Sequence, residues 1–222
     1  VVATGDFTFS GTATEASTIG VYISGEKYAE VNVAIGDLHT DVSAAIVAAI
    51  AANPDKSIPV STVDNAGAVE CTAKSKGPWG NSIDLSLNLE EGEALPAGIT
   101  VVVTAMASGA TNPDIQDALD AIGDQWLNVI VSPYVDATNI AKVEAYLATQ
   151  FGPTIQRDGV AYHAMRGTVS EITTFTAGAS RNSPHCVVVD AGNRKCAQSE
   201  LAAGVAAVCA GSAQEDASVP LH

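Results

Sequence analysis

The chain has 222 residues, enough for one large domain or two small ones, and 47% of them are hydrophobic, so it can bury a substantial core. Its formal net charge of −15 argues against nucleic acid or an anionic membrane surface as a partner, because both carry phosphate charges that would repel it. Apolar runs such as Val187–Val189 are far too short to span a bilayer.

The first part of the chain, residues 1–108, alternates apolar and polar residues, as expected for strands with one buried face. The alternation covers Phe7–Phe9, Val21–Ile23, Val31–Ile35, Val69–Ala73, Ile83–Leu89 and Ile99–Val103. One helix interrupts these strands, capped by Thr40 or Asp41 and ended by Asn53-Pro54. We therefore predict a small, strand-rich α+β domain with one helix over residues 1–108.

The small residues Ala107–Ala110 follow, and we interpret them as a hinge. From there on the apolar period becomes 3.6 residues, which is typical of amphipathic helices. The first helix is expected to begin at the cap Asn112 and to end at Gly123.

Three further helices alternate with short apolar strands. The predicted strands are Leu127–Val131, Val160–Met165 and His185–Val189. The helices carry Ile140, Val143 and Leu147, then Ile172 and Phe175 behind a Thr168–Glu171 capping box, then Leu201, Val205 and Val208 behind the cap Ser199. This alternation predicts a parallel sheet, and therefore an α/β domain over residues 109–222, with a tail from Gln214.

The four cysteines give no sign of a metal site. Cys71, Cys186, Cys196 and Cys209 form no CxxC pair, and no histidines accompany them at zinc-site spacing. We interpret them as thiols of a reducing compartment, with a Cys186–Cys196 bridge as the alternative. No cofactor and no metal are expected.

Ser183 and His185 form the most suggestive catalytic pair. A nucleophilic serine needs a base within hydrogen-bond range and a third group that orients the base, and here neither a third partner nor a G-x-S-x-G elbow accompanies the pair. We therefore predict no catalytic residues and interpret Asn182 and Ser183 as turn residues that bond the backbone. His163, inside a predicted strand, is interpreted as a packed or interface histidine rather than a catalytic base.

Acidic and glycine-rich segments also have structural explanations. Asp136, Asp158 and Asp190 lie near predicted strand ends, where α/β enzymes place acids, but two of them are suited to caps or turns. The segment Gly77–Asn81 lacks the lysine of a phosphate loop and is expected to be a turn anchored by Trp79. Glu90–Glu93 is interpreted as a solvated acidic turn.

Six phrases, in order and in register over nearly the whole chain, carry a family resemblance: GTATEASTIGVYISGEKY, TAKSKGPWGNSIDLSLN, LPAGITVVVTAMASGATNPDIQDAL, WLNVIVSPYVDATNIAKVEAYL, FGPTIQRDGVAYHAMRGT and ASRNSPH. Together they resemble the tail sheath protein of contractile-tailed, Mu-like bacteriophages. None of the phrases is a catalytic motif. Because the chain begins at Val1 rather than Met, we expect it to be a central fragment without the terminal arms of such a protein.

The resemblance implies a structural subunit and not an enzyme. Sheath subunits stack as hexameric rings around the tail tube in the virion and contract to drive genome delivery, after assembly in the host cytoplasm. Residues 109–222 would then be the sheath core, subtilisin-like in shape, and residues 1–108 a peripheral domain. The implied partners are neighbouring sheath subunits and the tube protein, while the fragment alone is expected to be monomeric.

Two other classes of protein remain as alternatives at this point. The first is an α/β hydrolase that uses Ser183 or another nucleophile. The second is a surface adhesin or carbohydrate-binding module built on the strand-rich part, although a chain with only two Trp and five Tyr offers few aromatic rings for stacking on sugars.

Overall fold

The fold was analysed in a computed structural model, which describes residues 1–53, 57–123, 125–177, 183–192 and 194–215. The chain divides into two compact units, Val1–Thr111 (unit 1) and Asn112–His222 (unit 2). Each unit is described by itself below.

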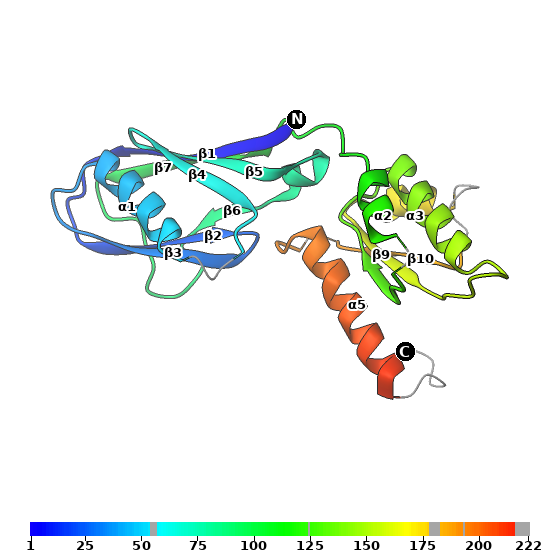
Figure 1. Cartoon of the computed structure of the whole chain (residues 1–222). Coiled ribbons are helices and arrows are strands. Elements are labelled where there is room, and N and C mark those ends of the chain that lie inside the picture. The colour runs from blue at the N-terminus through cyan, green and yellow to red at the C-terminus, as the bar shows by residue number, and fades with distance from the viewer. Residues whose placement is uncertain (54–56, 124, 178–182, 193, 216–222) are drawn as a thin grey trace. The chain divides into compact units, whose positions relative to one another are not determined.

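The described residues of unit 1 form seven strands, one α-helix and one 3-10 turn. In chain order these are β1 (Val2–Gly11), β2 (Ser17–Ile23), β3 (Glu26–Val33), α1 (His39–Ala51), β4 (Val60–Asn65), β5 (Ala68–Lys76), η1 (Pro78–Ser82), β6 (Leu85–Leu87) and β7 (Ile99–Ala107). The strands form two antiparallel sheets, ordered β4-β5-β1-β7 and β3-β2-β6. Figure 1 shows the two sheets facing each other with α1 beside them.

One continuous core joins both sheets of unit 1 to the helix. Phe7 of β1, Ile19 of β2, Ile46 of α1 and Val69 of β5 are all fully buried and belong to the same apolar cluster. The alternation read from the sequence explains this core, because every second residue of a strand faces the same side. In the four-stranded sheet, β1 lies between β5 and β7, and Thr4 of β1 is paired with Ala107 of β7.

Several details of unit 1 differ from the sequence-based expectation. The strand predicted over Ile83–Leu89 shrinks to β6, because Asn88 adopts a φ of 54° and its side-chain oxygen accepts the Gly20 amide. β4 was not predicted at all. Neither Thr40 nor Asp41 caps α1: the cap residue is Leu38, whose amide donates to the Asp41 carboxylate at 3.1 Å.

Unit 2 contains α2 (Gln116–Ile122), β8 (Val129–Val131), α3 (Ala137–Gln150), β9 (Val160–Met165), α4 (Val169–Thr176), β10 (Cys186–Asp190) and α5 (Gln198–Glu215). The three strands form a parallel sheet in the order β10-β9-β8. The predicted alternation of helices and strands is therefore confirmed for the described residues. The Thr168–Glu171 capping box and the helix end at Gly123 are also confirmed.

The sheet of unit 2 has a small apolar cluster on each face. Ala161 of β9 packs with Val143 and Leu147 of α3, whereas Ala164 packs with Ala202 of α5. Residues 161 and 164 point to opposite faces of a strand, so α3 and α5 cover opposite sides of the sheet. Both clusters are much smaller than the core of unit 1.

Two helices of unit 2 correct the expectation. α2 begins at Gln116 and not at Asn112, because the Asn112 side chain instead donates to Asp136 at the start of α3. α5 begins before Ser199, which lies inside the helix and does not cap it. The helix also buries Ala202 and Ala206 in place of Val208, which is 70% exposed. Gln214 lies inside α5, and residues 216–222 of the expected tail lie outside the described residues.

None of the four cysteines forms a disulfide, so the alternative Cys186–Cys196 bridge is not formed. None of the described helices combines the length and the apolar character needed to cross a membrane.

Candidate functional site

The Ser183–His185 pair is arranged as a turn. The Ser183 hydroxyl accepts a hydrogen bond from the main-chain amide of His185 at 3.2 Å, which confirms the turn role predicted for this serine. Asn182 lies outside the described residues. A serine nucleophile must instead donate its proton to a base, and the described contact uses the backbone of His185 rather than its ring.

The His185 ring lies near the amino-terminal ends of the parallel strands, since Trp126, Asp158 and His185 come just before β8, β9 and β10. It lies against the Phe151 ring, with centroids 5.3 Å apart, and its Nδ1 is 3.9 Å from the Asp158 carboxylate, too far for a hydrogen bond. The Trp126 indole N–H donates to the Asp158 carbonyl at 2.8 Å. Trp126 is 61% exposed and Phe151 is 55% exposed, so these two aromatic rings lie at the surface of unit 2.

The other singled-out acids and histidine have structural roles. Asp136 caps α3 and accepts the Asn139 amide at 2.9 Å. Burial alone would raise the pKa of Asp136, but hydrogen bonds of this kind outweigh burial and hold that pKa below its ordinary value. Asp190 accepts the Gly192 amide in a turn. His163 is fully buried with Nδ1 3.0 Å from the Tyr134 carbonyl oxygen. Within the described residues, no three or more His, Cys, Asp or Glu side chains could hold a metal ion.

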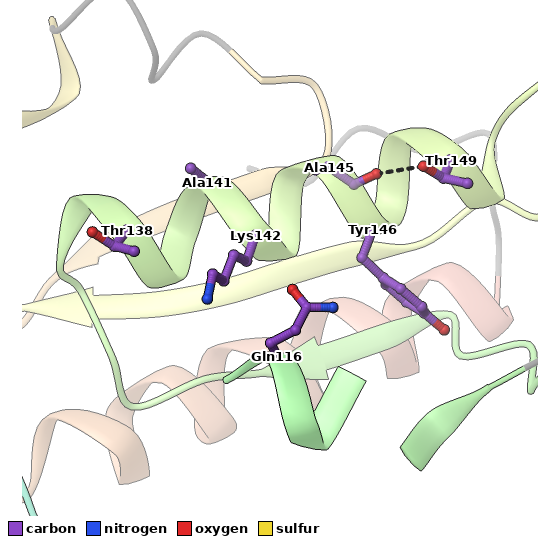
Figure 2. Close-up of a pocket in the computed structure, with 7 residues that line it drawn as sticks. All are labelled: Gln116, Thr138, Ala141, Lys142, Ala145, Tyr146 and Thr149. Atoms are coloured by element: carbon purple, nitrogen blue, oxygen red, sulfur yellow. Dashed lines mark hydrogen bonds between the residues drawn. The ribbon is translucent and has the colours of Figure 1, made fainter. Parts of the chain in front are cut away.

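One groove of unit 2 lies between α2 and the outer side of α3. Its volume is about 570 Å³. In Figure 2, Gln116 of α2 points up between Lys142 and Tyr146 of α3. The rest of the lining consists of the small residues Thr138, Ala141, Ala145 and Thr149.

Two polar side chains of this groove, Lys142 and Gln116, are bonded to acids outside its lining. Lys142 Nζ contacts both oxygens of Asp114, at 2.5 and 2.6 Å, and this bond lowers the pKa of Asp114. Gln116 donates to Asp120 at 2.8 Å. The lining thus offers no nucleophile with an adjacent base, and its small residues suit close packing against another surface.

A second, more apolar groove follows the outer side of α5. It is lined by Cys196, Glu200, Leu201, Gly204, Val205, Val208 and Cys209, with a volume of about 520 Å³. The sequence predicted Leu201, Val205 and Val208 to face inward. Leu201 does pack against the inner cluster and Val205 is half-buried, but Val208 is exposed. Because alanines can approach a sheet closely, Ala202 and Ala206 are the residues of this helix that pack deepest.

In unit 1, Glu93 corrects the interpretation of Glu90–Glu93 as a solvated turn. Its side chain is only 5% exposed; it lies 2.7 Å from Lys27 Nζ and accepts the Tyr22 hydroxyl at 2.8 and 2.9 Å. A Cβ on Gly20 would lie 2.2 Å from the carboxylate, so the glycine makes room for it.

This contact shifts the ionisation of its members. Burial alone would raise the pKa of Glu93, but the bonds from Lys27 and Tyr22 outweigh it and hold that pKa below its ordinary value. Burial, followed by the bond to Glu93, raises the pKa of Tyr22 to about 12.

The segment Gly77–Asn81 does form the predicted turn, with Trp79 packed against the core.

Comparison with known proteins gives these observations a context. A family model described as the phage tail sheath protein central domain matches residues 108–221. The chain belongs to the phage tail sheath family. It is also 38% identical, over 173 residues, to the Mu-like prophage FluMu tail sheath protein of Haemophilus influenzae. This match covers 78% of the chain and 35% of the relative, so the chain spans about a third of that protein's length.

The two matches differ in extent. The family model covers unit 2 and a few residues before it, whereas 173 aligned residues exceed the length of unit 2 and must extend into unit 1. Sheath membership thus agrees with the family resemblance that the sequence phrases predicted. The groove between α2 and α3 and the buried Glu93 had no comparable signal, since each depends on residues far apart in the chain.

Proposed function

We propose that this chain is the central part of a contractile tail sheath subunit. The observation that carries the proposal is its membership of the sheath family across unit 2, together with the similarity to a prophage sheath protein that extends into unit 1. In this role the protein polymerises around the tail tube, and contraction of the polymer drives the tube into the host. Its partners are neighbouring sheath subunits in hexameric rings and the tube protein.

The finer assignments follow from the same family. Residues 109–222 form the sheath core, with a subtilisin-like shape, and build the sheath wall. Residues 1–108 form a peripheral domain. The protein works in the virion tail and assembles in the host cytoplasm. It is not an enzyme, and the turn contact of Ser183 supports this, because its described bond does not serve proton transfer.

Exposed apolar side chains on unit 2 support a role in assembly. Val169 is 76% exposed, Val208 70% and Trp126 61%. An exposed apolar residue that is part of a larger apolar groove is typical of a surface that a partner covers. Val208 is such a residue, because it lines the α5 groove.

Electron microscopy of the full-length protein tests the proposal. Sheath-like tubes are expected from the full-length protein, and a monomer from the 222-residue chain by light scattering, because strand exchange through terminal arms needs segments beyond this chain. Dispersed full-length particles with esterase or peptidase turnover would favour a hydrolase instead. Regular tubes from the 222-residue chain would show that the lattice contacts lie within it.

A deletion separates the roles of the two units. Full-length protein that lacks Gly5–Met106 should still assemble if unit 1 is peripheral. A density map in which unit 1 lines the tube would contradict this arrangement.

A further inference from the structure

The chain leaves unit 1 through an unusually well-anchored segment. Asn81, in η1, forms two hydrogen bonds with the backbone of Gly109: its Oδ1 accepts the Gly109 amide at 2.7 Å, and its Nδ2 donates to the Gly109 carbonyl at 3.0 Å. The next amide, that of Ala110, donates to the Val1 carbonyl at 3.3 Å. We call the Asn81–Gly109 contact the first anchor.

Glycine is required at this anchor. A Cβ on residue 109 would lie 2.5 Å from the Gly77 carbonyl oxygen and 2.8 Å from Asn81 Oδ1. The two main-chain segments therefore approach each other more closely than any side chain permits. Ala107 is also held, because it belongs to β7 and pairs with Thr4.

The chain enters unit 2 through a second anchor, built on the start of α3. Asn139, which is 4% exposed, accepts the Ile115 amide at 3.0 Å and donates to the Pro113 carbonyl at 2.9 Å. The Asn112 side chain donates to the Asp136 carboxylate at 2.6 Å. The backbone angles of Asn112 are also restricted, because it precedes Pro113 and a residue before proline favours extended conformations. The ring of Pro113 fixes its own φ.

From these contacts we infer that the two units turn relative to each other about a single pivot residue, Thr111, and not about the segment Ala107–Ala110. The anchors hold the backbone on both sides of Thr111. Ala110 is itself held, because its amide donates to the Val1 carbonyl at 3.3 Å and its carbonyl accepts a hydrogen bond from the Val1 nitrogen at 2.8 Å. Thr111 has a φ of 58°, a left-handed conformation that β-branched residues rarely adopt. Thr111 is therefore the residue whose backbone angles change when the units reorient. This inference does not depend on the proposed sheath function.

Amide hydrogen exchange of the 222-residue chain, resolved by residue, tests the pivot. The amides of Gly109 and Ile115 should be protected, whereas the Thr111 amide should exchange at nearly the rate of an unstructured peptide. Equal exchange of Gly109 and Thr111 would overturn the inference, because the first anchor would then be open in solution.

Substitution of the anchor gives a second measurement. Asn81→Ala should speed exchange of the Gly109 amide by about 10-fold or more, since both bonds are lost, and should speed proteinase K cleavage at residues 107–112. Asn65→Ala is the matched control, because it removes one exposed side-chain bond of unit 1, to Glu70, and leaves the anchor intact. Rapid cleavage within 107–109 at the same rate in all three proteins would contradict the pivot.

The amides of β1 report whether Asn81→Ala has unfolded unit 1 as a whole. If the β1 amides lose protection together with the Gly109 amide, the variant has unfolded unit 1. The comparison of Gly109 with Thr111 exchange in the unsubstituted chain then decides whether the pivot exists. Asn139→Ala provides the equivalent test of the second anchor, where Ile115 should lose protection while Gly109 keeps it.

Discussion

Unit 1 and unit 2 differ in how their apolar cores are organised. In unit 1, residues from both sheets and from α1 join in a single buried cluster. In unit 2, a three-stranded sheet carries two separate small clusters, and α4 has no buried residue at all. We therefore expect unit 1 to fold as an independent domain.

The difference bears on where a partner would pack. A groove that stays apolar after folding is typical of a surface that a partner covers. Exposed apolar residues occur on both units, but the apolar α5 groove belongs to unit 2, which is also the part that matches the sheath central domain. That each unit folds on its own stays a prediction, and the following experiments test it.

The largest effect is expected in the core of unit 1. Phe7→Ala empties a fully buried position and should lower the free energy of unfolding of unit 1 by about 3–5 kcal/mol. The chain has two tryptophans, Trp79 in unit 1 and Trp126 in unit 2, so denaturant unfolding of Trp126→Phe and Trp79→Phe backgrounds reports the units separately. Unit 2 should be unaffected, and an equal loss in both units would refute their independence.

A smaller effect is expected from the buried carboxylate of unit 1. Glu93→Ala leaves the Tyr22 hydroxyl without its acceptor and should cost about 1–3 kcal/mol in the unfolding of unit 1. Glu91→Ala changes an exposed residue of the same turn and should stay within about 0.5 kcal/mol of the parent chain. Equal behaviour of the two variants would restore the interpretation as a solvated turn.

The same substitution predicts a pH dependence. The folded-state pKa of Glu93 lies below its ordinary value of 4.5, so its ionised form stabilises unit 1 above that value. This contribution is lost as the pH falls through the lowered pKa. The stability difference between the parent chain and Glu93→Ala should therefore be constant near neutral pH and shrink in acid.

Sequence patterns predicted the parts of the fold that depend on neighbouring residues. The limits of β9, the Thr168–Glu171 capping box and the helix end at Gly123 are examples, because each is decided within a few residues. The late start of α2 was missed because Asn112 bonds Asp136, 24 positions later. Glu93 was misread because Tyr22, 71 positions earlier, removes it from solvent.

The candidate site shows the same division. The turn role of Ser183 was predictable, since it involves a residue two positions away. The outward side of α5 was not, because alanine and valine are both apolar and only the distance to the sheet decides which side packs inward. Hydrophobicity alone therefore cannot orient a helix that is apolar on most of its surface.

A still smaller effect is expected at Ser183. Ser183→Ala removes the acceptor of the His185 amide and should cost about 1 kcal/mol in unit 2. Neither this variant nor His185→Ala should change hydrolysis of ester or peptide substrates, which we expect to stay at the level of buffer. Turnover that either substitution abolishes would overturn the structural role.

The smallest effect should come from the α5 groove. Val208→Ser should change the stability of the 222-residue chain by no more than about 0.5 kcal/mol, because Val208 is 70% exposed. Val143→Ser is the contrast, since Val143 is fully buried and its loss should destabilise unit 2 strongly. In the full-length protein, impaired tube formation by Val208→Ser with unchanged stability would identify the groove as an assembly contact.

The pairing of Thr4 with Ala107 brings the first and the last strand of unit 1 together at one place. Cα atoms of directly paired antiparallel residues lie about 4.5–5.5 Å apart. A deletion of Gly5–Met106 would therefore leave two chain ends a short distance apart, and a turn of about two added residues is the shortest connection that reverses the chain between them.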